Sequence, residues 1–290
     1  MERAEAEQSS AVAVSACGSL IAFGGHDEPV VAMSASKSVA SLAVGLLVDD
    51  GVLALDMPAS TWIPEWRRGP HAAITVRHLF SHTSGLDDSR TDFAVSDIAS
   101  HAIGSPVVAK PGSLYKYNNN AVDLVGVVVG RAAKLPMDEL LQQRLFDPMG
   151  VRAYWRVDRL GAPRAAGELV IRPTDLLKIG ELILAGGMWE GKRLISEGWV
   201  EASLAPSQRF VPEHGLLWWR EGRTEDVWGY AARGWLGQYL VVVPSHQLAG
   251  VRMRHPAWRD YEEGSAPRVY ADFPGDLHAL VSASASAGCP

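Results

Sequence analysis

The hydrophobic period changes twice along the chain, and this order constrains the fold more than any other feature. Residues 11–25 form two β-prone stretches around a short turn, which predicts a hairpin. From 34 to about 204 the apolar residues mostly recur at helical spacing, and 215–254 return to short strand patterns. A closing helix is expected over 273–284. We therefore expect an α+β fold, with one antiparallel sheet built from both ends of the chain and helices on its faces.

The 290 residues are expected to form a single domain, 1–290, with two lobes. The sheet lobe comprises about 11–33 and 205–284, and the mainly helical lobe comprises about 34–204. Residues 285–290 are expected to be a disordered tail. The helices expected within the middle of the chain lie at 34–50, 74–86, 121–134, 137–150 and 173–187.

Composition and charge exclude several classes of protein. The formal net charge is −6 and no basic patch stands out, so we expect no binding to nucleic acid or to an anionic membrane. The longest apolar run, 39–48, is too short to span a bilayer, and the first residues show no signal-peptide pattern, so we expect a cytoplasmic protein. The two cysteines, Cys17 and Cys289, predict neither a disulfide framework nor a cysteine metal site.

The first candidate for chemistry is Ser34-Ala35-Ser36-Lys37, at the start of the first long helix. Residues i and i+3 share a helical face, so Ser34 and Lys37 can meet. A serine becomes nucleophilic when a base removes its proton, and a desolvated lysine can serve as that base. The alternative is a serine helix cap beside a solvated lysine. An S-x-x-K pattern alone arises about once by chance in a chain of this length.

The second candidate is Tyr117-Asn118-Asn119, which precedes an apolar helix. A tyrosine beside a lysine cation can relay the proton of a serine, and an amide two residues on can bind a substrate carbonyl. The alternative is that the asparagines form a turn and a helix cap, with Tyr117 packed in the core.

The third candidate is the strand pattern YAARGWLGQYLVVVP at 230–244. Its glycines would let a ligand approach a strand edge closely. The alternative is a β-bulge or a bend at the same glycines.

Taken together and in this order, the three motifs resemble the serine β-lactamase and penicillin-recognising superfamily. The closest similarity is to the branch that holds class C β-lactamases, their esterase relatives and amide hydrolases of the nylon-oligomer type. Further segments with this resemblance are ITVRHLFSHTSGL at 74–86, LFDPMGV at 145–151 and the long stretch at 165–200. The resemblance therefore covers most of the chain and implies a β-lactamase-like fold.

The resemblance also implies a role for each matching residue. Ser34 would be the acylated nucleophile, and Lys37 and Tyr117 would share general base and acid work. Asn119 would help to bind the acyl part of the substrate. The oxyanion hole would combine the backbone N–H of Ser34 with that of Trp235, aimed at charge that appears only in the transition state.

One position departs from the family pattern. The strand motif of the family usually begins with lysine or histidine, whereas here Ala232 and Arg233 precede Gly234. The lysine that meets a β-lactam carboxylate is therefore missing, which places efficient β-lactam hydrolysis and D-Ala-D-Ala peptidase activity in doubt. Arg233 would either bind a carboxylate in its place or face away from the pocket.

Other residues have mainly structural interpretations. His82, in SHTSG, is expected to be a helix-end or turn histidine. Asp123 is expected to be a surface or capping residue. Trp218, Trp219 and Trp235 would either line an apolar acyl pocket or pack in the core. No H-E-x-x-H or G-x-S-x-G motif occurs, so neither a zinc site nor an α/β-hydrolase elbow is expected.

The sequence therefore predicts a serine hydrolase that acts on an ester or amide of a small molecule, with no metal and no organic cofactor. Two alternatives stay open: an acyltransferase that passes the acyl group to an amine or alcohol, and a non-catalytic binding protein on the same fold. The natural substrate and the oligomeric state cannot be read from the sequence.

Overall fold

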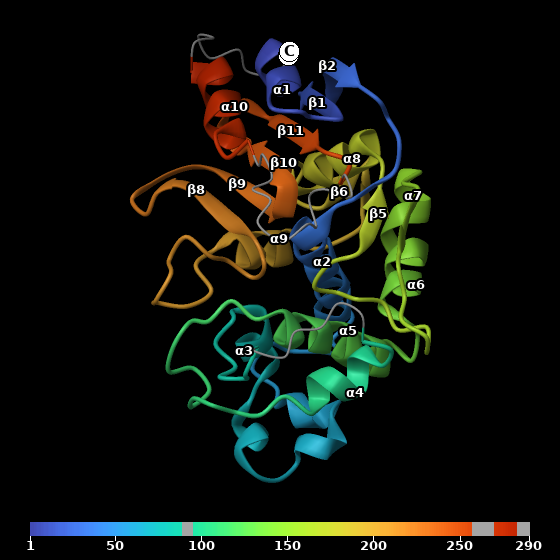
Figure 1. Ribbon diagram of the computed structural model, residues 1–290, viewed down its shortest axis with the longest axis vertical. Helices are drawn as coiled ribbons and strands as arrows, with labels where there is room; N and C mark the ends of the chain where they lie inside the picture. The colour runs from blue at the N-terminus through green and yellow to red at the C-terminus, as the bar shows by residue number, and fades with distance from the viewer. Residues whose placement is uncertain (89–94, 257–269, 283–290) are drawn as a thin grey trace.

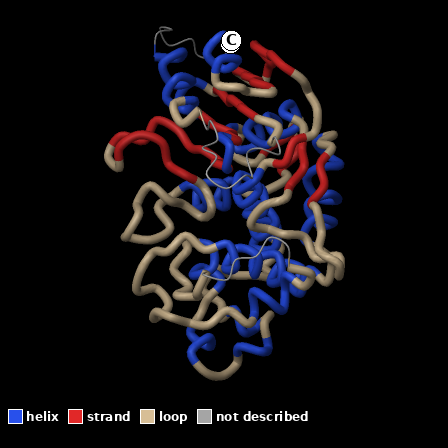
Figure 2. Tube along the Cα trace, in the orientation of Figure 1, coloured by secondary structure: helices blue, strands red, loops and turns tan. Residues whose placement is uncertain are grey.

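One antiparallel sheet joins the two ends of the chain, which confirms the predicted α+β architecture. In the computed structural model, which describes residues 1–88, 95–256 and 270–282, six strands lie in the order β2-β1-β11-β10-β9-β8. Figure 1 shows this sheet in one half of the molecule, and Figure 2 shows that helices and loops fill the other half. The six strands are β1 (Ala11–Ala16), β2 (Ser19–Gly25), β8 (Trp219–Arg223), β9 (Asp226–Gly234), β10 (Gln238–Val243) and β11 (Leu248–Met253).

Helices and minor strands account for the rest of the described secondary structure. The helices are α1 (Glu2–Ala6), α2 (Ser36–Asp49), α3 (Val76–Phe80), α4 (Ile98–Ile103), α5 (Asn119–Ala133), α6 (Met137–Leu141), α7 (Asp147–Met149), α8 (Pro173–Leu184), α9 (Glu197–Leu204) and α10 (Phe273–Ser282). The minor strands are β3 (Val30–Val31), β4 (Ala153–Trp155), β5 (Leu169–Ile171), β6 (Met188–Trp189) and β7 (Lys192–Arg193). No helix in the described ranges is long and apolar enough to cross a bilayer.

The large sheet separates two apolar layers. On the face that we call the inner face, Ala232 and Leu240 join the main core that includes α2 and α8. On the opposite, outer face, Ala231 and Tyr239 pack in a second cluster with residues of α10. A Cβ added at Gly180 of α8 would lie 2.7 Å from the Leu240 side chain, so this helix lies directly on the sheet. Helix α8 therefore packs with the sheet lobe, although it falls within the range expected for the helical lobe.

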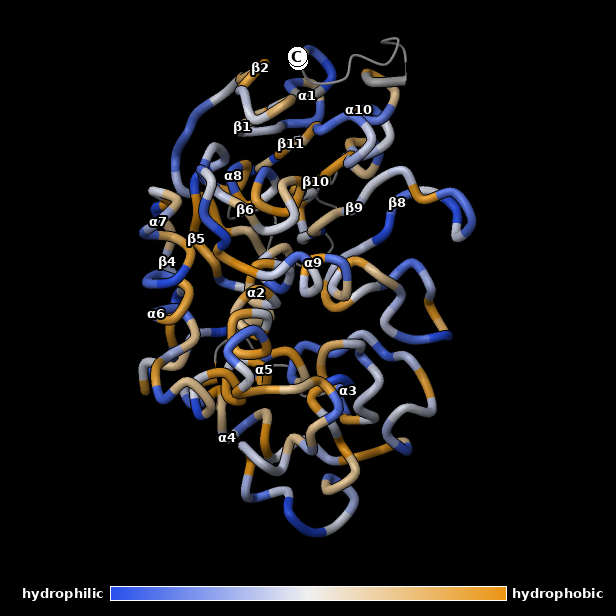
Figure 3. The backbone as a smooth tube through the Cα atoms, turned by 180° about the vertical axis from the view of Figure 1, so that it is seen from behind, coloured by the Kyte–Doolittle hydropathy of each residue, from blue (hydrophilic) through white to orange (hydrophobic). Residues whose placement is uncertain are grey.

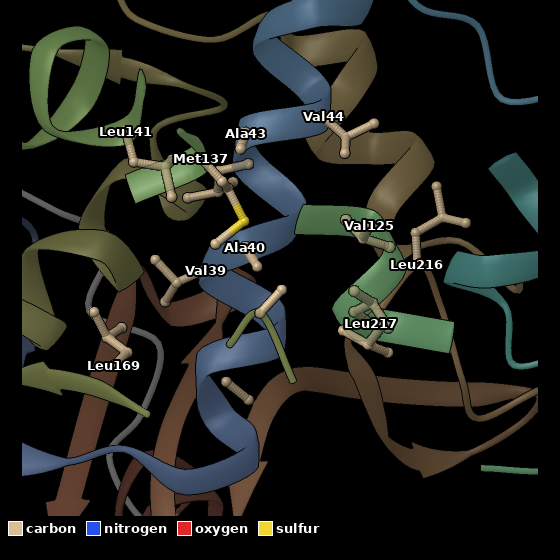
Figure 4. Packing of buried hydrophobic residues seen from close by; sticks show 14 of the residues in the cluster. Val39, Ala40, Ala43, Val44, Val125, Met137, Leu141, Leu169, Leu216 and Leu217 are labelled. Carbon is tan, nitrogen blue, oxygen red and sulfur yellow. The ribbon is translucent and has the colours of Figure 1, made fainter. Parts of the chain in front are cut away.

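Helix α2 runs through the centre of the molecule and is buried on nearly every side (Figure 4). The sequence predicted an apolar stripe, but the serines and small residues between the stripe positions are buried too. An apolar sequence around the whole helix is typical of a helix enclosed by other elements, and Figure 3 shows its mainly hydrophobic and neutral colouring at the junction of the lobes. The labelled neighbours in Figure 4 come from α5, α6, β5 and the segment before β8: Val125, Met137, Leu141, Leu169, Leu216 and Leu217.

Several predicted boundaries differ from the structure. The helix expected at 74–86 is limited to α3, because His82 takes a left-handed φ of +55° that a helix does not accommodate. The strand expected from 215 begins at Trp219. Strands β3 to β7 were missed, because segments of two or three residues are too short to show a period.

The cysteine prediction also needs correction. Cys17 lies at the turn between β1 and β2 and takes part in a disulfide bond. Spacing along the sequence does not report which cysteines meet in space. Cys289 and the tail at 285–290 lie outside the described residues.

Candidate active site

Ser34 lies on a 3-10 turn, η1 (Met33–Ala35), directly before α2. Met33 has a left-handed φ of +50°, which is unfavourable for a residue with a side chain and is typical of functional sites. The N–H of Ala32 donates to the Leu169 carbonyl at 2.8 Å, so β5 holds the turn in place. Ser34 itself is half-buried. The turn therefore presents the serine at the edge of the core.

Lys37 lies in the first turn of α2 and is only 3% exposed. Its Nζ donates to Ser34 Oγ at 2.9 Å and to the carbonyl oxygen of Ala166. The predicted i, i+3 pairing is therefore present. Because the Ala166 carbonyl holds one N–H, the nitrogen stays directed at the serine. In its neutral form such an amine can accept the serine proton.

The neighbouring serines of the motif have structural roles. Ser36 is fully buried, and its Oγ accepts a hydrogen bond from the Leu169 N–H at 3.1 Å. The Ser38 hydroxyl donates to the Leu217 carbonyl at 2.6 Å. Neither hydroxyl is directed at Lys37, which supports Ser34 as the candidate nucleophile.

Tyr117 comes from the loop that enters α5 and meets the S-x-x-K motif. Lys37 Nζ lies 5.0 Å from the centroid of the Tyr117 ring, a cation–π distance. On its other side the ring contacts His82, with 4.5 Å between centroids. The structure therefore brings the first two predicted motifs together, although 80 residues separate Lys37 from Tyr117 in the sequence.

The three consecutive asparagines have different surroundings. Asn118 caps α5, because its side-chain oxygen accepts from the Ala121 N–H at 2.7 Å. The Asn120 amide donates to the Ser105 hydroxyl at 3.1 Å. Asn119 is half-buried, and its side chain makes no hydrogen bond to any part of the chain that the structure describes. One asparagine, Asn118, therefore caps the helix, while the side-chain amide of Asn119 can bind a ligand.

Gly234, the last residue of β9, touches the turn that carries Ser34. A Cβ placed there would lie 2.4 Å from the Ala32 oxygen and 3.1 Å from the Ala35 nitrogen. Real side chains do not approach a backbone oxygen this closely, so this position requires glycine. The third predicted motif therefore meets the first. The glycine is required by the close approach of the turn of Ser34, whereas the sequence had suggested the approach of a ligand or a bulge.

The next turn, η6 (Trp235–Gly237), is held from the interior by Arg252. The buried guanidinium donates to the carbonyl oxygens of Leu236 and Gly237. Leu236 has a left-handed φ of +67°, a second strained position beside the site. Trp235 remains 40% exposed. Its side chain therefore lies at the surface rather than in the core, unlike Trp218, which is fully buried.

Arg233 lies on the outer face of the sheet, away from Ser34. Its guanidinium donates to both carboxylate oxygens of Glu221, at 2.6 Å each, and stands 5.4 Å from the Trp219 ring. Side chains alternate across a strand, so Arg233 and Gly234 face opposite sides. The structure therefore does not bring Arg233 to the other candidate residues, and the second of the two readings proposed for it fits the geometry.

Two buried histidines stand behind Tyr117. His82 accepts a hydrogen bond at Nδ1 from the Asn118 N–H at 3.2 Å, and its ring centroid lies 5.0 Å from that of His214. Burial lowers the pKa of His82 well below its usual value, and the nearby His214 and Lys37 lower it further. Burial likewise lowers the pKa of His214 to about 4. Both rings are therefore neutral near pH 7. His82 is a turn histidine as expected, whereas His214 belongs to no motif and was missed.

Asp123 is neither exposed nor a helix cap, which corrects the expectation from the sequence. It is 2% exposed, and Oδ2 accepts from Arg164 Nη1 at 2.9 Å. Its Oδ1 accepts from the Ala166 N–H, also at 2.9 Å. Burial raises the pKa of the Asp123 carboxyl, and the Arg164 guanidinium opposes this effect. A lone acid within the apolar helix 121–134 was the signal that could have indicated a buried ion pair.

The structure brings together a turn-mounted serine, a buried lysine and a tyrosine, the three side chains that the resemblance to β-lactamases implies. The β-lactamase family model matches residues 2–255, and the chain belongs to this family. Among the described residues, no group of three or more His, Cys, Asp and Glu side chains is placed to hold a metal ion.

The curated relatives include an esterase and a hydrolase, each matched over part of its length. Esterase EstB from Burkholderia gladioli is 32% identical over 143 residues, which cover 41% of this chain and 36% of the esterase. The 6-aminohexanoate-dimer hydrolase from Paenarthrobacter ureafaciens is 25% identical over 206 residues, covering 63% of this chain and 52% of the hydrolase. The chain thus spans about half or less of the length of these relatives.

Solved structures agree with the fold along nearly the whole chain. A penicillin-binding protein from Bacillus halodurans superposes with a TM-score of 0.75 at 17% identity, covering 96% of this chain and 97% of that one. A β-lactamase from Mycobacterium bovis gives a TM-score of 0.70 at 19% identity, with 95% and 94% covered. At these identities the likeness establishes the β-lactamase-like fold.

Proposed function

We propose that the protein is a serine hydrolase that cleaves an ester or amide of a small molecule through an acyl-enzyme on Ser34. The observation that carries this proposal is the 2.9 Å contact between Lys37 Nζ and Ser34 Oγ. A nucleophile within hydrogen-bond reach of a base, with the base oriented by a third group, is the geometry that covalent catalysis requires. Here the third group is the Ala166 carbonyl.

In this mechanism Lys37 and Tyr117 share the proton of Ser34 while its Oγ attacks the substrate carbonyl. The carbonyl oxygen of the substrate then carries negative charge, which the backbone N–H groups of Ser34 and Trp235 stabilise. When the intermediate collapses, the same lysine and tyrosine return the proton to the leaving group. Water then repeats the sequence on the acyl-enzyme and releases the acid. Asn119 holds the acyl part through its side-chain amide.

The inner face of β9 favours a substrate that has no carboxylate near this strand. The position at which relatives of this fold carry lysine or histidine is Ala232, which is fully buried here. Arg233 is bound to Glu221 on the outer face and does not replace that cation. A carboxylate at this position would lack an ionic partner and would pay its desolvation cost. Esters and amides that are neutral in this region are therefore favoured over β-lactams, in line with the esterase among the relatives.

A fluorophosphonate probe followed by mass spectrometry tests the proposal. The probe should label Ser34, and Ser34→Ala should abolish the label. Lys37→Ala should slow labelling by at least about 100-fold, the usual contribution of a general base. Ser36→Ala serves as the matched control and should keep the label on Ser34. A folded wild-type protein that stays unlabelled would overturn the proposal and favour a binding protein on this fold.

A further inference from the structure

One short segment around Ala166 connects the S-x-x-K motif with the helix that follows the Y-x-N motif. The Ala166 carbonyl accepts from Lys37 Nζ, and the Ala166 N–H donates to Asp123 Oδ1 at 2.9 Å. Ala166 therefore binds α2 with its carbonyl and α5 with its amide. Because its backbone makes both contacts, any displacement of the residue also moves the acceptor of Lys37.

A buried ion pair holds this segment. Arg164 Nη1 donates to Asp123 Oδ2 at 2.9 Å, and the two side chains are 4% and 2% exposed. The Arg164 carbonyl also accepts from the Gly167 N–H at 3.1 Å, which closes a turn around Ala166. A buried ion pair adds little net stability compared with apolar residues of similar volume, so its presence favours a role in fixing geometry.

Asp123 also belongs to the helix that begins at the Y-x-N motif. Helix α5 starts at Asn119, one turn before Asp123, and Tyr117 lies just ahead of it. The same helix therefore places Tyr117 over Lys37 and, through Asp123, controls the carbonyl that holds Lys37. The charged groups around Asp123 are Arg164 beside it, Lys37 from α2, and Asp88 from the loop before α4.

We propose that Asp123 and Arg164 are positioning residues, which hold the Ala166 carbonyl where it keeps the Lys37 amine directed at Ser34. This inference rests on the proposed function for its kinetic consequence. Neither side chain contacts Ser34, so the pair acts through Lys37 and not on the reacting atoms. Loss of the pair therefore affects the chemical step more than the binding of substrate.

The test is Asp123→Asn, which keeps the size and one acceptor oxygen but removes the negative charge that faces Arg164. With a neutral p-nitrophenyl ester, kcat should fall roughly 10- to 100-fold, the effect of a displacement of about 1 Å at a catalytic group. KM should stay within about twofold, because an interaction that orients the base is not made with the substrate. Labelling of Ser34 by the fluorophosphonate should slow by the same factor as kcat.

Asp175 offers a matched control. It is also a buried helical aspartate that accepts from a backbone N–H, that of Arg152 at 3.0 Å, and from a cation, Lys178, at 2.8 Å. Asp175→Asn should lower the melting temperature while leaving kcat near the wild-type value. The double variant Asp123→Asn with Arg164→Gln removes both charges. It should recover part of the stability that Asp123→Asn loses, while kcat stays low.

A second readout does not depend on activity. The ¹³Cε signal of Lys37, assigned by its disappearance in Lys37→Arg, should move in Asp123→Asn and stay in place in Asp175→Asn. If the wild type proves unreactive, the proposed function fails while this signal still decides the positioning role. A wild-type kcat and an unmoved Lys37 signal in folded Asp123→Asn would overturn the inference, and so would an equal loss of kcat in Asp175→Asn.

Discussion

The two faces of strand β9 carry different kinds of residue. On the inner face, Ala232 and Gly234 are small and uncharged, and Gly234 touches the turn that carries Ser34. On the outer face, Arg233 is bound to Glu221 and lies away from Ser34. One residue along a strand reverses the direction of the side chain. A missing cation on the inner face is therefore not replaced by an arginine next to it.

The two sides of the sheet also differ in the charges that their side chains carry. Around the serine, burial lowers the pKa values of His82 and His214, so that both rings are neutral near pH 7. On the outer side, the Arg233 guanidinium is 41% exposed and pairs with the Glu221 carboxylate.

Gly234→Ala should have the largest effect, because it alters the contact between the inner face of β9 and the turn of Ser34. The added Cβ would press on the Ala32 oxygen, so the end of β9 must move away from the turn of Ser34. We expect fluorophosphonate labelling to slow by about 100-fold or more, since a shift near 1 Å has this effect. Gly198→Ala is the control, because a Cβ there meets nothing within 4 Å. Equal labelling of the two variants would show that the close approach is unimportant.

The lowered pKa of His214 predicts that the protein loses stability at acidic pH. The folded-state pKa of His214 is about 4, below the value of about 6.5 in the unfolded chain, so the unfolded state binds more protons between these values. Stability is therefore full above pH 6.5 and is lost as the pH falls toward 4. The contribution of His214 to the loss from pH 7 to 5 should be about 2 kcal/mol, measured as the difference in urea unfolding between the wild type and His214→Gln. His214→Gln should flatten this decline, and an unchanged slope would contradict the assignment.

Arg233→Ala should have the smallest effect. Removal of a half-exposed partner from Glu221 should cost about 1 kcal/mol of stability. Because Arg233 faces away from Ser34, the values of kcat and KM should change equally for neutral esters and for esters that bear a carboxylate. A selective rise of KM for the carboxylate substrates would show instead that Arg233 reaches the site.

Local patterns predicted a large share of the fold and the centre of the site. The hairpin of β1 and β2, the strands β9 to β11 and the helices α2, α5 and α8 follow from periodicity and turn residues. Ser34 and Lys37 meet because three residues of helical backbone bring them together, which sequence spacing alone specifies. Tyr117 and Gly234 required the resemblance to the family, since no local pattern places them beside Lys37.

Contacts between distant residues account for what the sequence did not show. Asp123 looked like a surface acid because Arg164, its partner, lies 41 residues away in an irregular segment. His214 had no recognisable neighbours until the fold placed it against His82. The direction of Arg233 was left open because the motif does not state which face of the strand it occupies. Each of these depends on tertiary packing, which propensity and spacing do not encode.

The pairing of β1 with β11 has a consequence for the synthesis of the protein. Ala11 leaves the ribosome 242 residues before its partner Met253. At about 5–20 residues per second, the first strand and the apolar helix α2 wait roughly 12–50 s for the strands that enclose them. Because the end of β9 must also reach the turn of Ser34, this turn gains its support only after Gly234 has been made.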